Sequence, residues 1–210
     1  MYMNKPNTKL LLNIPAVLLL GVVLQITGSY LVNAFCEIVS MHSDGVPSYI
    51  LNQIDKYNSV ITDLSSLEPR MIVYVIFAAP LIEEIVFRIL FLRIFLKFIP
   101  FWAANLLQSL LFGIYHGGLI QGTYSFLMGL AIGAIFFYTK EGMKSSLIAD
   151  LDAFIFGLFL HMTVNASGLY LAPLFPVGLP VNTQVIISLA GVIMVIALVI
   201  YAKVYVKKHE

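Results

Sequence analysis

The sequence predicts an all-α protein, a polytopic bundle of about six transmembrane helices, and three observations support this fold class. Hydrophobic residues make up 60% of the 210 residues and charged residues 11%, against roughly 45–50% and about 25% in a soluble domain. The hydrophobic residues form charge-poor stretches close to the ~20 residues with which a helix crosses the hydrocarbon core. Polar residues inside these stretches recur four positions apart, a spacing that places them on one helix face.

The predicted spans end where charged residues interrupt the apolar sequence. They cover about 10–36, 70–96, 101–117, 122–139, a stretch within 145–172, and 183–202. The first is expected to be an uncleaved anchor, because its apolar part is far longer than the ~7–15 residues of a secretory signal. No linker or repeat divides the chain, so we expect a single integral membrane domain over residues 1–210.

The positions of lysine and arginine predict the orientation. With the N-terminus in the cytoplasm, most of them lie on the cytoplasmic side: Lys5, Lys9, Arg93, Lys97, Lys140, Lys144, Lys203, Lys207 and Lys208. Lys56 and Arg70 then lie outside, and Arg88 lies within the membrane. Because cytoplasmic loops are enriched in positive residues, both termini are predicted to be cytoplasmic, in a multi-pass protein of the cell membrane.

The long polar segment 41–69 is predicted to form an amphipathic helix outside the membrane. Its apolar residues recur at steps of three and four: Val46, Ile50, Ile54, Tyr57, Ile61 and Leu64. This is the period of a helix with one apolar face. The pattern favours a helix lying on the outer membrane surface over a lid that controls access.

Two adjacent glutamates and an arginine lie inside the second predicted span, where an ionisable group costs several kcal/mol and is a functional candidate. Glu84 and Arg88 are four apart, in the order that favours a helical ion pair, and pairing would neutralise both charges in low dielectric. Glu83 points about 100° away from Glu84, so it is left free to face a cavity. A carboxylate in such a position is a candidate general base.

Two histidines and an asparagine complete the set of candidates. Phe112 and His116 are four apart in the third span, and His161 and Asn165 are four apart in the fifth. At about 1.5 Å per residue, Glu83 lies roughly 20 Å from either end of its span, while His116 lies roughly 22 Å and His161 roughly 12–24 Å from the cytoplasmic side. All three can therefore share a layer near mid-membrane. Together the candidates would supply water activation and oxyanion stabilisation.

The same residues also have a packing interpretation. His116 shares a helix face with Asn105 and Ser109, and polar residues on such a face can simply bond a neighbouring helix. The histidine–asparagine pair of the fifth span is open to the same interpretation. Gly129 and Gly133 in the fourth span are predicted to be a close-packing face only.

Three motifs in these spans resemble those of the CAAX protease and bacteriocin-processing family, the Abi group of intramembrane glutamate proteases. Residues 83–88 match EExxxR, residues 112–116 match FxxxH, and residues 161–165 match HxxxN, in the order of the family. The resemblance covers a motif-bearing core of about 70–172. The first and last spans carry no signature and are only compatible with it.

The resemblance implies a role for each matched residue. It implies that Glu83 is the base that activates water and that His116 holds the same water. It further implies that His161 and Asn165 stabilise the tetrahedral oxyanion. The implied activity is that of an intramembrane endopeptidase with a metal-independent mechanism and no cofactor, in which Glu84 and Arg88 act as a supporting pair.

Other functions stay open at the same positions. Glu83, His116 and His161 are also a two-histidine, one-carboxylate set of the kind that binds zinc with water in the fourth position. Members of the resembled family also appear as bacteriocin immunity proteins and membrane scaffolds, so a non-catalytic regulatory role is a second alternative. A transporter has less support, because no inverted repeat is visible.

The predicted partners are the lipid bilayer and a peptide or protein substrate, with membrane-associated and lipidated peptides both among the open alternatives. The net charge of +1 argues against a nucleic-acid partner, because no basic patch exists beyond the short ends of helices. Nothing in the sequence predicts an oligomeric state.

Overall fold

The computed structural model describes residues 8–64, 66–141, 147–171 and 178–208, and within these ranges all regular secondary structure is helical. The elements are α1 (Thr8–Met41), α2 (Ser48–Leu64), α3 (Pro69–Val73), η1 (Tyr74–Ala78), α4 (Ala79–Glu84), η2 (Ile85–Leu92), α5 (Arg93–Phe95), α6 (Phe101–His116), α7 (Leu119–Glu141), α8 (Leu147–Tyr170) and α9 (Val181–Lys208). The all-α prediction is confirmed for this part of the chain, and α2 is the helix predicted in the polar segment.

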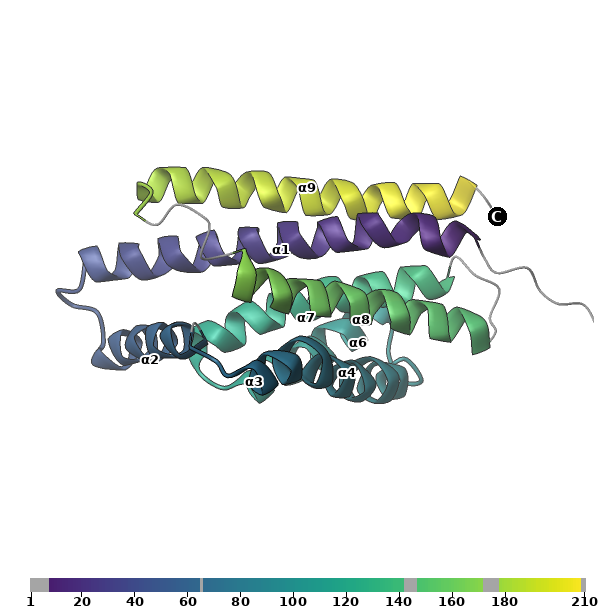
Figure 1. Cartoon of the computed structure of the whole chain (residues 1–210), viewed down its shortest axis with the longest axis horizontal. Helices are drawn as coiled ribbons and strands as arrows, with labels where there is room; N and C mark the ends of the chain where they lie inside the picture. Colours follow the sequence, from purple (N-terminus) through teal and green to yellow (C-terminus); the bar gives the residue numbers. More distant parts are fainter. Residues whose placement is uncertain (1–7, 65, 142–146, 172–177, 209–210) are drawn as a thin grey trace, which may run out of the picture.

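Figure 1 shows α1 and α9 side by side along one edge of the bundle, with α8 next to α1. Helix α7 contacts both α6 and α8, and the rod from α3 to α5 lies at the other edge, against α6 and α8. Helix α2 contacts α7, and the Gln53 side-chain oxygen accepts a hydrogen bond from the Leu119 N–H at 2.9 Å. Helix α8 is therefore central, in contact with α1, α4 and α7.

Three helices of the described residues are long and apolar enough to cross a membrane: Ile14–Met41, Leu119–Phe137 and Leu151–Tyr170. They correspond to the first, fourth and fifth predicted spans. In the sixth span, the part of α9 whose side chains are described without a gap, Val181–Ala197, is apolar. Helix α6 has 16 residues, or about 24 Å, less than the ~30 Å hydrocarbon core. The chain ends and Lys144, on which the predicted orientation partly rests, lie outside the described residues.

The second predicted span is a continuous rod whose regular α-helix is interrupted twice, at η1 and η2. The Ala79 N–H donates to the Tyr74 carbonyl five residues earlier, the hydrogen-bond spacing of a π-helix. The equivalent donor for the Val75 carbonyl would be residue 80, a proline, which has no N–H. The Val75 carbonyl is therefore left for a partner outside the rod. Single π turns are frequent at functional sites, and here they flank α4, which carries both glutamates.

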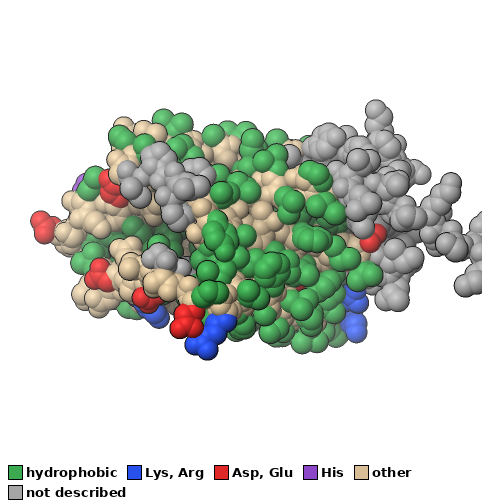
Figure 2. Space-filling view, in the orientation of Figure 1, with side chains coloured by type: hydrophobic (Ala, Val, Ile, Leu, Met, Phe, Trp, Pro, Cys, Tyr) green, Lys and Arg blue, Asp and Glu red, His purple; other side chains and the backbone are tan. Residues whose placement is uncertain are grey.

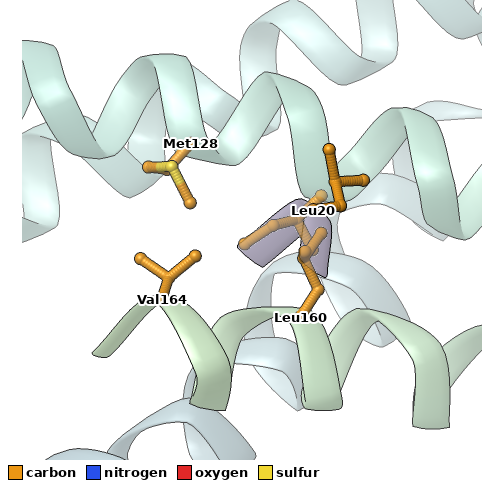
Figure 3. Close-up of a cluster of buried hydrophobic side chains, with 5 residues drawn as sticks. Leu20, Met128, Leu160 and Val164 are labelled. Atoms are coloured by element: carbon orange, nitrogen blue, oxygen red, sulfur yellow. The ribbon is translucent and has the colours of Figure 1, made fainter. Parts of the chain in front are cut away.

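A cluster of buried hydrophobic side chains joins α1, α7 and α8. Its buried members are at most 6% exposed: Leu20, Met128, Ile132, Leu160 and Val164. Figure 3 shows Met128 on α7 directed toward Val164 on α8, and Leu20 beside Leu160. This packing fixes α8, which carries half of the candidate site, against the two long apolar helices.

Helices α6 and α7 approach each other closely, as the glycine pattern predicts. A Cβ on Gly133 would overlap the side chain of Asn105, so only glycine fits there. The Asn105 amide donates to the Leu130 carbonyl at 3.0 Å, and the Gln108 amide lies 3.1 Å from the Gly129 carbonyl. Polar side chains at the start of α6 therefore bond α7, and the close-packing prediction is confirmed.

The surface is strongly hydrophobic between its ends. Figure 2 shows hydrophobic side chains over the middle of one face, with acidic and basic side chains toward its ends. Large hydrophobic residues are exposed on several helices, for example Phe77 (53%), Ile114 (66%) and Ile193 (68%). An apolar surface of this extent is unusual for a soluble monomer and is the surface that lipid covers, so the protein is a membrane protein.

Candidate active site

One cavity of about 690 Å³ is lined by residues of α1, α2, η1, α4, α6, α7 and α8. Glu83, His116, His161 and Asn165 all line it. Glu83 comes from α4, His116 is the last residue of α6, and the other two lie one turn apart on α8. The volume is typical of a small-ligand site. The structure therefore brings the four predicted catalytic side chains to one space.

The predicted supporting pair lies behind the wall of this cavity. Arg88 is 0% and Glu84 1% exposed, and neither lines the cavity. Arg88 Nε lies 3.1 Å from Glu84 Oε2, so the structure contains the ion pair that the four-residue spacing predicts. Charges buried to this degree are tolerated when they are paired, because removal of either partner leaves the other uncompensated.

Glu84 also contacts α8. Its Oε1 lies 2.8 Å from His161 Nδ1, and because a carboxylate oxygen accepts, Nδ1 is the donor. A Cβ on Gly157 would lie 3.3 Å from Glu84 Oε2, so the glycine one turn before His161 permits this close approach. Gly157 was missed by the sequence analysis, although its spacing of four from His161 places both on one helix face. Glu84 thus links the buried arginine to the histidine at the cavity.

Glu83 has a neighbour that the sequence did not reveal. Its Oε2 lies 3.4 Å from His161 Nε2, and the two residues are 8% and 5% exposed. Glu83 faces the cavity, as its position relative to Glu84 suggests, but it is not isolated there. His161 lies between the two carboxylates, with one ring nitrogen toward each.

The hydrogen bond of His116 determines which of its nitrogens is free. His116 Nδ1 lies 2.8 Å from the Phe112 carbonyl oxygen. Because a carbonyl oxygen can only accept, this contact assigns the proton to Nδ1. In the neutral ring Nε2 is then unprotonated and can accept a hydrogen bond from water.

The ring of Phe112 packs against three residues of the site, namely His116, His161 and Arg88. Its ring makes edge-to-face contacts with the rings of His116 at 4.5 Å and His161 at 5.7 Å. Arg88 Cζ lies 4.8 Å from the ring centroid, within the range of a cation–π interaction. The Arg88 guanidinium nitrogens make no hydrogen bond with the described residues, so this ring and Glu84 provide its stabilisation. The sequence analysis gave Phe112 no role of its own.

Asn165 is bonded to the helix that carries the glutamates. Its Nδ2 donates to the Val75 carbonyl at 2.9 Å, the carbonyl that Pro80 leaves without a helical donor. Asn165 therefore ties α8 to η1. An amide nitrogen has two hydrogens, and one of them remains for a group in the cavity.

The cavity continues beyond the predicted residues, toward α1 and α2. Helix α1 contributes Gln25, Ser29 and Asn33, and α2 contributes residues that include Tyr57 and Asn58. Helix α2 is thus a wall of the cavity as well as an amphipathic surface helix. Burial, with a smaller contribution from Cys36, raises the pKa of Tyr57 to about 12. The three α1 residues are spaced four apart, the signal that identified the motifs, but the sequence analysis did not single them out.

The geometry gives the zinc alternative no support. Among the side chains that the structure describes, no three from histidine, cysteine, aspartate or glutamate are grouped so that they could hold a metal ion. The arrangement suits acid–base chemistry instead, because a carboxylate and two histidines face one space while a second carboxylate and an arginine balance charge behind them.

The fold is that of a helical membrane protein. A family model described as "Type II CAAX prenyl endopeptidase Rce1-like" matches residues 65–167, a segment that contains all three motifs. This match covers just under half of the chain and confirms the resemblance to the CAAX protease family that the motifs carry. No curated protein and no solved structure matches the chain.

Proposed function

We propose that this protein is an intramembrane endopeptidase that hydrolyses a peptide or lipidated peptide substrate with water activated by Glu83 and His116. The observation that supports this most is that Glu83, His116, His161 and Asn165 line a single cavity, while Glu84 and Arg88 are buried behind it. Each of these residues belongs to one of the three motifs that resemble the protease family, and all of them lie within residues 65–167, which match the family model.

In the proposed reaction Glu83 takes a proton from a water molecule that also donates a hydrogen bond to His116 Nε2. The water oxygen then bonds to the carbonyl carbon of the scissile peptide and forms a tetrahedral oxyanion. When the intermediate collapses, the carbon–nitrogen bond breaks and the proton held by Glu83 passes to the leaving amine. General base catalysis of this kind contributes about 10²–10⁴-fold in rate.

His161 and Asn165 are the proposed donors to the oxyanion. Asn165 would use the amide hydrogen that Val75 does not occupy. His161 can donate through Nε2 only when both ring nitrogens carry protons, because Nδ1 already donates to Glu84. Glu84 therefore orients the ring, and Arg88 pairs with Glu84 in its buried position.

For the membrane topology we propose six spans in one domain, with both termini in the cytoplasm of a cell-membrane protein. The distribution of lysine and arginine in the sequence supports this orientation. The proposed mechanism uses no metal and no cofactor.

The test is cleavage by the purified protein in lipid vesicles. A set of internally quenched peptides, with and without a farnesylated cysteine, is assayed by fluorescence, and the products are identified by mass spectrometry. We expect cleavage at a defined peptide bond that a zinc chelator does not inhibit. Failure to cleave any peptide would favour the non-catalytic immunity or regulatory role, and chelator inhibition reversed by zinc would favour a zinc protease.

A further inference from the structure

Helix α1 presents a strip of uncharged polar side chains to the candidate active-site cavity. Gln25, Ser29 and Asn33 are spaced four apart and all line the cavity. This segment precedes the residues that match the protease family, and the proposed mechanism gives it no role. A polar strip inside a helix long and apolar enough to cross the membrane is costly unless it has partners.

The inner end of the strip is fixed and its outer end is free. The Gln25 side-chain oxygen accepts a hydrogen bond from the Tyr124 hydroxyl, and its nitrogen donates to Ser29 Oγ at 3.0 Å. Gln25 also packs against Gly168, where a Cβ would lie 3.1 Å from the Gln25 nitrogen. Ser29 has no acceptor for its hydroxyl hydrogen, and Asn33 makes no side-chain hydrogen bond, within the described part of the chain. Both therefore have hydrogen-bonding capacity for a ligand.

The exposure of these residues indicates where the cavity opens. Gln25 and Ser29 are half-buried, while Asn33 is exposed. Asn58 on α2, which lines the same cavity, is exposed as well. The strip therefore runs from the level of α8 outward to an opening beside α2.

The charge of the lining limits what the cavity can hold. Among the described residues that line the cavity, Glu83 is the only carboxylate, and none is a lysine or an arginine. The two histidines also line the cavity. A bound carboxylate or phosphate would have no lysine or arginine to pair with, and would approach Glu83. Burying an unpaired charge is strongly unfavourable, whereas peptide N–H and C=O groups are matched by hydroxyl and amide side chains.

The length of the strip fits a short piece of extended chain. From residue 25 to residue 33 a helix rises about 12 Å, and an extended peptide covers about 3.3 Å per residue. The strip is therefore as long as three or four extended substrate residues.

We infer that Ser29, positioned by Gln25 and Tyr124, and Asn33 bind the uncharged main chain of an extended internal peptide segment next to the scissile bond. This assignment deepens the proposed endopeptidase function and rests on it. The substrate class is an internal segment of a peptide, in which the cavity holds no terminal carboxylate.

The test measures binding without turnover. A fluorescently labelled farnesylated peptide, made once with a free carboxyl terminus and once amidated, is titrated by anisotropy into the Glu83→Gln protein in vesicles. Since one hydrogen bond contributes about 0.5–1.5 kcal/mol, we expect Ser29→Ala and Asn33→Ala each to weaken binding of both peptides about 3- to 10-fold. Ser40→Ala is the matched control, because Ser40 lies on α1 outside the cavity and bonds its own helix at Cys36; it should leave the affinity unchanged.

Three outcomes would overturn the inference: no binding of either peptide, unchanged affinity in both α1 variants, or a loss confined to the free-acid peptide. Failure of the proposed function gives a different pattern. In that case the Glu83→Gln protein binds the peptides in a manner sensitive to Ser29 and Asn33, but the wild-type protein does not cut them. Circular dichroism and thermal unfolding of each variant identify any loss caused by misfolding.

Discussion

The two halves of α6 carry polar residues on one helix face but use them differently. In the first half Asn105, Gln108 and Ser109 are fully buried and bond one another and the backbone of α7. In the second half His116 lines the cavity beside the ring of Phe112. Helical spacing alone does not predict which of these polar residues pack against α7 and which line the cavity.

The difference lies in what the neighbouring helix offers. Next to the first half, Gly129 and Gly133 of α7 face polar side chains, which reach the α7 backbone. Helix α7 is also close to the second half, at Gly113 and Gly122, but there α4 and α8 bring Glu83 and His161 to a cavity that His116 lines as well. Where neighbouring helices leave no space, a buried polar residue in a membrane bundle is thus a packing contact. Where they leave a cavity, it is a candidate catalytic or binding residue.

The largest effect is expected at the cavity end of α6. His116→Ala removes the proposed hydrogen-bond acceptor of the reacting water, so turnover should fall about 10²–10⁴-fold while the thermal midpoint changes little. His42→Ala is the matched control, because exposed His42 makes the same type of bond, from Nδ1 to the Ile38 carbonyl at 3.0 Å, outside the cavity. Equal turnover in the two variants would remove His116 from the site.

The next effect concerns the ion pair behind the cavity. Arg88→Ala leaves Glu84 buried without its partner, which should lower the free energy of unfolding by roughly 3–5 kcal/mol and reduce turnover as well. Arg70→Ala is the control, since the Arg70–Glu68 pair at 2.7 Å is exposed and such pairs contribute only ~0–1 kcal/mol. Denaturant titration of both variants measures the contrast. Similar stabilities for the two would show that the buried pair is not needed for the fold.

A third prediction separates two roles of Asn165. Asn165→Ala removes both the bond to Val75 and the proposed oxyanion donor, so kcat should fall about 10²–10³-fold with KM within a few-fold. Adding Pro80→Ala gives residue 80 an N–H that can bond the Val75 carbonyl. We expect the double variant to regain thermal stability but not kcat. Recovery of both would mean that Asn165 acts only by joining α8 to η1.

The smallest effect is expected at the closed half of α6. Asn105→Ala removes the hydrogen bond to the Leu130 carbonyl and a partner of Gln108, which should cost roughly 1–3 kcal/mol of stability. Turnover per folded molecule should be unchanged. A large loss of kcat in the folded fraction would contradict the separation of α6 into two functional halves.

The candidate site could be predicted from the sequence because ionisable side chains inside apolar helices are costly in free energy. Ionisable groups in apolar stretches are conspicuous, and the four-residue spacing assigns them to helix faces. The sequence did not predict which residues on neighbouring helices contact each other. The contact of His161 with Glu84 depends on close packing at Gly157, and the bond of Asn165 depends on a π turn in front of Pro80. Neither follows from periodicity.

The fold could be predicted as a membrane helix bundle, and three of the predicted spans correspond to helices long and apolar enough to cross a membrane. Hydropathy identifies α1, α7 and α8 because their apolar runs are long and uninterrupted. The rod from α3 to α5 contains the charged residues of the candidate site, and α6 is short. Length and composition therefore do not identify either of them as a membrane span. The strip on α1 was overlooked because its residues are uncharged and match no motif, although their spacing was visible.

The account rests on Glu83 as the group that activates water, and one variant tests it directly. Glu83→Gln keeps the size of the side chain and most of its hydrogen bonding but removes the proton acceptor. With a peptide that the wild-type protein cleaves in vesicles, we predict a turnover about 10²–10⁴-fold lower, measured per folded molecule, with normal insertion and an unchanged thermal midpoint. Cleavage at the wild-type rate by folded Glu83→Gln protein would contradict the mechanism.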